Sequence, residues 1–186
     1  MALHDRIRKL TYDDYVLIPE DGQRHEIIDG EHYVSPAPAI RHQRLVSRLD
    51  RTLGVFVDES GLGEVFVAPC DTLFSRYDIV QPDLLYISNE RAGIVTEKNV
   101  QGSPDLIVEI LSPRTRDRDE GIKLDLYERF GVPEYWIFDP VLKKAHIYRR
   151  KGDRLQIVAD LSAEAGDVLS TPLLPGFVLK ITEIFA

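Results

Sequence analysis

The sequence predicts an α/β protein in which a central mixed β-sheet is flanked by helices. Three observations lead to this fold class. Residues 40–58 and 115–130 carry the apolar spacing or the end signals of long helices. Short apolar runs typical of strands lie before the second of these segments and after it. The resulting order of helix, strands, helix and strands is typical of sheets covered by helices.

The N-terminal part of the chain is expected to form a short helix and a hairpin. Thr11 is a plausible N-cap for the short helix, because its side chain can accept a hydrogen bond from the first turn. Residues 24–28 and 31–35 are predicted strands. Asp29 and Gly30 join them, and this dipeptide is a strong signal for a tight hairpin turn.

The first long helix is predicted over residues 40–58. Its expected apolar face consists of Leu45, Leu49, Leu53 and Phe56. Short strands are predicted after it, at residues 64–68, 72–74 and 84–87. Residues 90–102 have a mixed pattern that predicts a loop or a short helix.

A second long helix is predicted over residues 115–130, after an apolar strand that ends at Leu111. Acidic residues in its first turns favour the positive end of a helix, and Gly131 and Pro133 form a helix stop. Further strands are then predicted at residues 135–138, 145–149 and 155–159. Tyr135, Trp136 and Phe138 are expected to belong to the core, because strand alternation accounts for them.

Length and composition are those of a globular protein. We expect the 186 residues to form one domain over residues 1–186, with 44% hydrophobic and 29% charged residues. No apolar stretch reaches the roughly 20 residues needed to span a bilayer. The start of the chain lacks the apolar core of a signal peptide, and Cys70 is the single cysteine. These features predict a cytoplasmic protein.

The formal net charge of −8 argues against broad, non-specific binding of nucleic acid. The charge is uneven, however. Residues 114–151 contain ten Lys or Arg and seven Asp or Glu, so this segment is locally basic. Such a segment could contact phosphates, and solvated surface charge explains it equally well.

Glu109 is a carboxylate inside the otherwise apolar run from Leu106 to Leu111. Such runs usually form strands that are buried on both faces, where an isolated charge is costly. Asp83 immediately precedes another apolar run, so two acids from two strands suggest a cation site. An ordinary ion pair between Glu109 and a Lys or Arg is the alternative.

Asp83 and Glu109 form the better pair of candidate metal ligands. Mg²⁺ takes oxygen ligands, usually one or two carboxylates with waters and phosphates. Two neighbouring strands would bring these two acids within about 5 Å. Asp105, the competing candidate, precedes Glu109 by four residues on the same strand, which places it about 13 Å away. One ion cannot bridge that distance.

Three further polar residues are candidates with competing explanations. Glu26 is a possible third acid, although a salt-bridged or solvent-facing Glu is the simpler reading of its local sequence. Lys123 could bring an ammonium over the end of the sheet, or it could be an exposed partner of Asp119 four residues earlier. His42 could contact a substrate, and a surface position is expected for it.

Several fragments in order resemble one family. They are Arg24-His25-Glu26-Ile27-Ile28-Asp29-Gly30-Glu31, Gln81-Pro82-Asp83-Leu84, Ser103 to Pro113 around Glu109, and Lys123 with Tyr127 before Gly131-Val132-Pro133-Glu134-Tyr135-Trp136. With Glu109 lying 26 residues after Asp83, they resemble the PD-(D/E)xK nuclease superfamily, and within it the Uma-two family of endonucleases. The resemblance covers most of the chain between Thr11 and Arg149.

The resemblance implies a restriction-endonuclease-like core with an added N-terminal hairpin. It also implies that Asp83 and Glu109 are magnesium ligands, and that Glu26 is a site residue in that hairpin. The superfamily pattern has a Lys two residues after the second acid, where this chain has Leu111. By resemblance, Lys123 supplies that amine from the following helix.

The function expected from the residues and the resemblance together is a Mg²⁺-dependent endonuclease acting on DNA, with Mn²⁺ as a substitute. Glu26, Asp83, Glu109 and Lys123 are its expected catalytic residues. A homodimer is expected, because cleavage of both strands calls for two sites. The rival from another class is a non-catalytic module that keeps the fold and binds nucleic acid or protein. A hydrolase of smaller phosphoesters is a third hypothesis.

Overall fold

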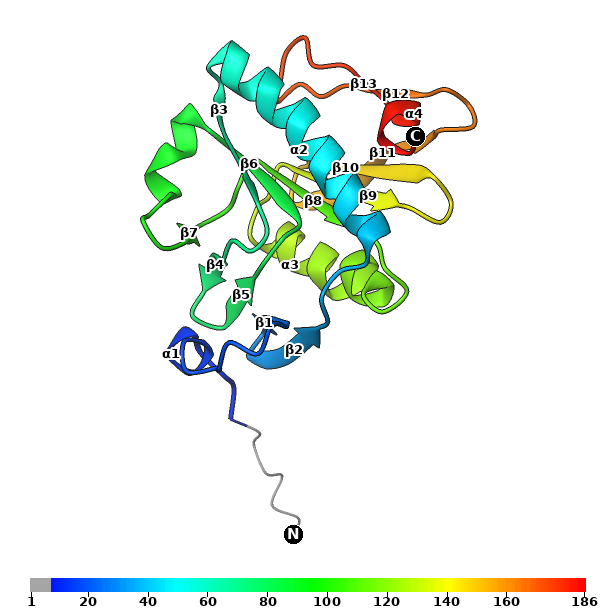
Figure 1. Cartoon of the computed structure of the whole chain (residues 1–186). Coiled ribbons are helices and arrows are strands. Elements are labelled where there is room, and N and C mark those ends of the chain that lie inside the picture. Colours follow the sequence, from blue (N-terminus) through cyan, green and yellow to red (C-terminus); the bar gives the residue numbers. More distant parts are fainter. Residues whose placement is uncertain (1–7) are drawn as a thin grey trace.

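A six-stranded mixed sheet forms the centre of the computed structural model, which describes residues 8–186 (Figure 1). Residues 1–7, on which the expectation about the start of the chain depends, lie outside the described part. Strands β8 (Leu106–Ile110) and β9 (Glu134–Asp139) are parallel, and the other neighbouring strands of this sheet are antiparallel. The strand order is β11 (Arg154–Ser162), β10 (Lys144–Lys151), β9 (Glu134–Asp139), β8 (Leu106–Ile110), β6 (Leu84–Ser88) and β3 (Gly63–Val67). The predicted fold class is confirmed.

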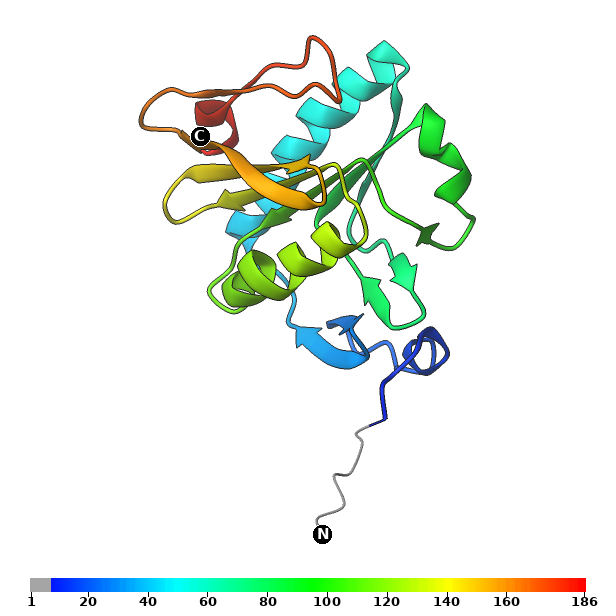
Figure 2. The ribbon, with the colours of Figure 1, turned by 180° about the vertical axis from the view of Figure 1, so that it is seen from behind.

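Helices cover both faces of this sheet. α2 (Ile40–Ser60) crosses one face, and α3 (Lys123–Arg129) lies on the opposite face (Figures 1 and 2). Successive side chains of β8 point to opposite faces of the sheet. Val108 packs in the apolar cluster that includes α2, and Ile107 packs in the cluster that includes α3.

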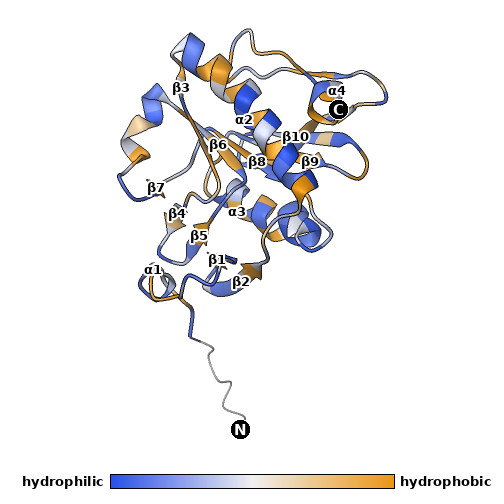
Figure 3. Ribbon diagram, in the orientation of Figure 1, coloured by the Kyte–Doolittle hydropathy of each residue, from blue (hydrophilic) through white to orange (hydrophobic). Residues whose placement is uncertain are grey.

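The apolar face of α2 is close to the predicted one. Hydrophilic and hydrophobic residues alternate along its ribbon in Figure 3, as expected where the two kinds occupy opposite sides of a helix. Its buried residues are Leu45, Leu49, Leu53 and Val57. Val57 replaces Phe56 as the most buried residue of the last turns, and the half-buried Phe56 packs edge-on against Phe177.

The predicted N-terminal hairpin is part of a second, five-stranded sheet. Its order is β2 (Glu31–Ser35), β1 (Arg24–Ile28), β5 (Asp78–Val80), β4 (Thr72–Ser75) and β7 (Val100–Gln101). Asp29 and Gly30 form the turn with φ of 51° and 79°, the left-handed conformation expected for this dipeptide. β1 pairs with β5 through Ile27 and Ile79, so the hairpin extends a sheet.

The second predicted helix is more complex than a single α-helix. Its first part is a π-helical turn, η2 (Arg118–Ile122), and α3 follows without a break. The mixed segment at residues 90–102 forms a 3₁₀ helix, η1 (Asn89–Ile94), and strand β7. A π-helical turn inside a helix often marks a functional position.

The remaining elements lie at the two ends of the chain. α1 (Tyr12–Tyr15) begins after Thr11, whose backbone N–H donates to the Asp14 carboxylate at 2.9 Å. β12 (Val168–Leu169), β13 (Leu179–Lys180) and α4 (Ile181–Ile184) were not predicted. Their apolar residues join the core cluster on the α2 side of the sheet. Throughout residues 8–186, every helix is too short or too polar to cross a membrane.

The packing of α2 against the sheet predicts a large loss of stability on truncation. Leu49 is 2% exposed, so Leu49→Ala should lower the free energy of unfolding by about 2–5 kcal/mol. Val55 lies on the same helix and is 54% exposed, so Val55→Ala is the matched control and should change it by less than about 0.5 kcal/mol. Urea unfolding followed by circular dichroism measures both. Similar losses in the two variants would contradict the assigned face of α2.

Candidate active site

Asp83 and Glu109 come together because β6 and β8 are neighbours. Leu84 pairs with Val108 in this antiparallel ladder, and one further step places Asp83 opposite Glu109. Glu109 contacts Lys123 and Tyr127 of α3, and both Asp83 and Glu109 are 2% exposed. The proximity predicted from the two strands is therefore present in the structure.

Glu26 reaches the same place from the second sheet. β1 carries it, and its Oε1 accepts a hydrogen bond from the backbone N–H of Gln81 at 3.0 Å, two residues before Asp83. Glu26 is fully buried and does not face solvent. Of the two simpler readings of its sequence, the solvent-facing one is wrong and the salt-bridged one is correct, because Glu26 pairs with Lys123. Glu26 also lies in the same cluster as Glu109.

Lys123 lies at the centre of the acidic residues. Its Nζ is 2.7 Å from Glu109 Oε1, 2.8 Å from Glu26 Oε1 and 3.7 Å from Asp119 Oδ1. Tyr127, one helical turn further along, donates its hydroxyl to Glu109 Oε1 at 2.9 Å. Lys123 is 1% exposed, so the reading of an exposed Lys paired only with Asp119 is wrong.

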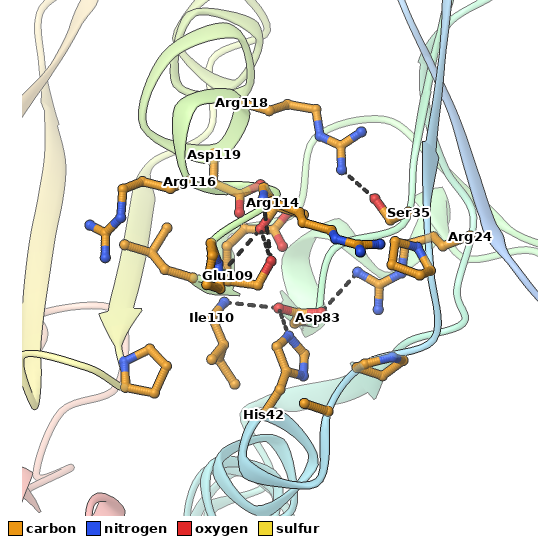
Figure 4. Close-up of a pocket in the computed structure, with 18 of the residues that line it drawn as sticks. Arg24, Ser35, His42, Asp83, Glu109, Ile110, Arg114, Arg116, Arg118 and Asp119 are labelled. Carbon is orange, nitrogen blue, oxygen red and sulfur yellow. Dashed lines mark hydrogen bonds and ion pairs between the residues drawn. The ribbon is translucent and has the colours of Figure 1, made fainter.

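Asp83 is held by a different set of groups (Figure 4). Arg24 Nη1 is 2.8 Å from Oδ1, His42 Nε2 is 2.9 Å from Oδ2, and the Ile110 backbone N–H donates to Oδ2 at 2.8 Å. The expectation that His42 lies on the surface is wrong, because its side chain is 12% exposed and faces the site. Arg24 was not predicted as a site residue.

The other sequence candidates fall outside this cluster or take structural roles. Asp105 forms an ion pair with Arg91 at 3.1 Å and accepts from the Ser88 backbone N–H at 2.8 Å. Leu111 is buried in the apolar cluster beneath α3 and carries no polar group. Tyr135, Trp136 and Phe138 are fully buried in the core, as predicted.

A cavity of about 650 Å³ opens beside the cluster. Besides Glu26, Asp83, Glu109 and Lys123, its lining includes the guanidinium groups of Arg24, Arg41, Arg114, Arg116 and Arg118. Three buried polar atoms in this lining have no hydrogen-bond partner within residues 8–186, namely Glu26 Oε2, His42 Nδ1 and Arg118 Nε. Buried polar groups are normally satisfied, so these atoms mark a place suited to a polar ligand.

Burial and neighbouring charges separate the pKa values of the carboxyl groups. Burial would raise the pKa of Asp83, but the His42 hydrogen bond and the Arg24 charge lower it to about 2. Burial is the main cause that raises the pKa of Glu109 to about 8; Lys123 opposes this rise, and Asp83, Asp119 and Glu26 add to it. Asp119 likewise has a pKa raised by burial, to about 6.

Neighbouring charges favour the ionised forms of Glu26 and Lys123. Although burial opposes its charge, the nearby Lys123 and Arg118 lower the pKa of Glu26. Burial alone would lower the pKa of Lys123, yet the surrounding carboxylates raise it. One ammonium therefore serves three carboxylates, and the cluster favours an additional positive charge.

The candidate ligands are carboxylate oxygens, which is the ligand type that Mg²⁺ prefers. Asp83 and Glu109 supply two carboxylates on adjacent strands, which is the number that Mg²⁺ often takes from a protein. Within residues 8–186 there is no group of three or more His, Cys, Asp or Glu side chains arranged as metal ligands. Oδ2 of Asp83 accepts two hydrogen bonds and Oδ1 accepts one, so Oδ1 keeps a lone pair for a metal ion.

Comparisons with known proteins identify a family and a solved structure of similar fold. A family model, Uma2, described as "Putative restriction endonuclease", matches residues 12–182. A crystal structure from Anabaena variabilis ATCC 29413, described as a "putative nuclease belonging to DUF820", superposes with a TM-score of 0.78 at 19% identity. That match covers 95% of this chain and 97% of the other. None of the curated proteins matches the chain.

The raised pKa of Glu109 predicts that stability falls between about pH 5 and pH 8. In this window the folded state holds a proton that the unfolded state has released, so the free energy of unfolding decreases as the pH rises. The slope should reach about 1.4 kcal/mol per pH unit for one proton.

Urea unfolding in EDTA across this pH range measures the effect. In Glu109→Gln, which cannot titrate, the slope between about pH 6 and pH 8 should largely disappear. An equal slope in both proteins would show that another group carries the proton.

Proposed function

The chain belongs to the Uma2 family, and from this premise we propose that it is a Mg²⁺-dependent endonuclease that hydrolyses phosphodiester bonds in DNA. One observation carries the proposal. Glu26 and Glu109 lie within 2.8 Å of a shared ammonium, and Asp83 stands on the strand beside Glu109. The group lines a cavity that is rich in arginine, as a site for phosphates would be.

Each side chain has a role that follows from its position. Asp83 and Glu109 would hold the ion, which when bound supplies stabilisation of negative charge on the phosphate. Lys123 would orient the attacking water or stabilise the charge that develops on the phosphate oxygens. Glu26 would hold that water, because its Oε2 has no hydrogen-bond partner among residues 8–186.

Arg24 and His42 act on Asp83. They hold both of its oxygens in one orientation, and Arg24 keeps the carboxylate ionised. When a cation binds, either side chain can turn from Asp83 towards a phosphate in the cavity, since both line it. We assign both as positioning residues.

One observation favours the rival function, a non-catalytic binding module. The ammonium of Lys123 already pairs with Glu26 and Glu109, and Asp83 already accepts three hydrogen bonds. A protein that had lost metal binding could keep its fold with these contacts. The family match and the arginine-lined cavity favour the nuclease.

Cleavage of supercoiled plasmid DNA tests the nuclease proposal. With Mg²⁺ or Mn²⁺, Asp83→Asn and Lys123→Met should each lower the cleavage rate by about 100-fold or more, because each removes a group that acts on the reacting phosphate or the ion. Gel electrophoresis of time points gives the rates.

Asp105→Asn is the matched control, since Asp105 also follows a proline and is buried but pairs with Arg91 outside the site. It should cleave at the wild-type rate. Calorimetry distinguishes the nuclease from the non-catalytic module. If the wild-type protein gives no heat of binding with Mn²⁺ or Mg²⁺, the non-catalytic module is favoured. Cleavage that survives both site variants would exclude this site.

We also propose a homodimer, because each chain offers one candidate site and cutting both strands of DNA calls for two. Light scattering at micromolar protein should give about twice the 21.2 kDa mass of the chain. A monomer mass that persists in the presence of duplex DNA would contradict this arrangement.

A further inference from the structure

We propose that the sugar–phosphate backbone of the nucleic acid leaves the cavity along the first half of α2 and binds a second, basic hollow there. The basic hollow consists of Arg41, Arg44, Arg48 and Lys143. This proposal rests on the proposed function, because it names the phosphates next to the cleaved one as the ligand. The hollow has a volume of about 250 Å³.

The basic hollow continues the cavity of the candidate active site. Arg41 and Pro140 line both spaces, so the two spaces are adjacent. His42, which holds Asp83, is the neighbour of Arg41 on α2. A chain bound across the carboxylates can therefore pass directly to the hollow.

The helix places its cations on one side. Arg41, Arg44 and Arg48 follow each other at spacings of three and four residues, which brings them to one face of α2. Lys143 joins them from the turn between β9 and β10. A row of cations along one helix face is suited to successive phosphates of one strand.

These cations lack acidic partners. Across residues 8–186, none of the four forms an ion pair; the other residues that line the hollow are Leu45, Pro140, Phe185 and Ala186, the last residue of the sequence, and none of them is Asp or Glu. Arg48 donates to the backbone carbonyl of Ile184 at 2.8 Å, which fixes its position without neutralising it. In a chain with a net charge of −8, four neighbouring unpaired cations are an unusual concentration of positive charge.

Lys143 adds a local argument. Its φ is 52°, in the left-handed region that favours Gly, Asn or Asp. This turn therefore carries a long cationic side chain where a smaller residue would fit the backbone better. Lys143 is exposed and lines the hollow together with Pro140, which also lines the cavity.

Salt-dependent binding of a fluorescent 20-base-pair duplex, followed by anisotropy in EDTA, tests the proposal without cleavage. Replacing two cations that contact phosphates, in Arg44→Gln/Lys143→Gln, should lower the slope of log K against log salt by about 2. Affinity at 0.1 M salt should fall by about 10- to 100-fold.

Lys98→Gln/Lys151→Gln is the matched control, because both lysines are exposed and form no ion pair with a described residue, and neither lines the basic hollow. It should bind as the wild type does. An unchanged slope in Arg44→Gln/Lys143→Gln, or an equal change in the control, would overturn this inference and leave the proposed function standing. Wild-type protein that does not bind the duplex would overturn the proposed function as well.

Discussion

The buried ammonium of Lys123 is the interaction on which the site and much of the fold depend. It joins Glu26 of the second sheet, Glu109 of the central sheet and Asp119 of the π-helical turn. A buried charge is tolerated only when it is paired, and removing one partner of such a group is strongly destabilising. The contacts that shape the candidate site therefore also hold the two sheets together. Catalytic geometry and tertiary structure share one set of side chains.

Much of this arrangement could be predicted from local sequence. The apolar run around Glu109 indicated a doubly covered strand, and Asp83 at the mouth of a neighbouring strand indicated a second acid beside it. Their proximity follows from strand pairing alone. The position of Lys123 came from the family resemblance, because helix spacing was equally compatible with an exposed ion pair. Burial decides between these readings, and burial is a property of the tertiary structure.

Other features depend on contacts that a single sequence does not encode locally. Arg24 and His42 meet Asp83 from 59 and 41 residues away, and no spacing rule connects them. The position of His42 in the first turn of α2, after a proline-rich segment, was the only local signal. β5 has three residues and shows no alternation, because all three are buried. Its pairing with β1 is what brings Glu26 to the site.

The π-helical turn at Arg118–Ile122 has a consequence for the orientation of the helix that follows it. A π-helical turn contains one residue more than an α-helical turn, and each residue of a helix advances it by about 100°. The additional residue is taken up inside the turn, so the turn sets which side of the following helix faces the two sheets. Here it leaves both Asp119 and Lys123 on the side of Glu26 and Glu109.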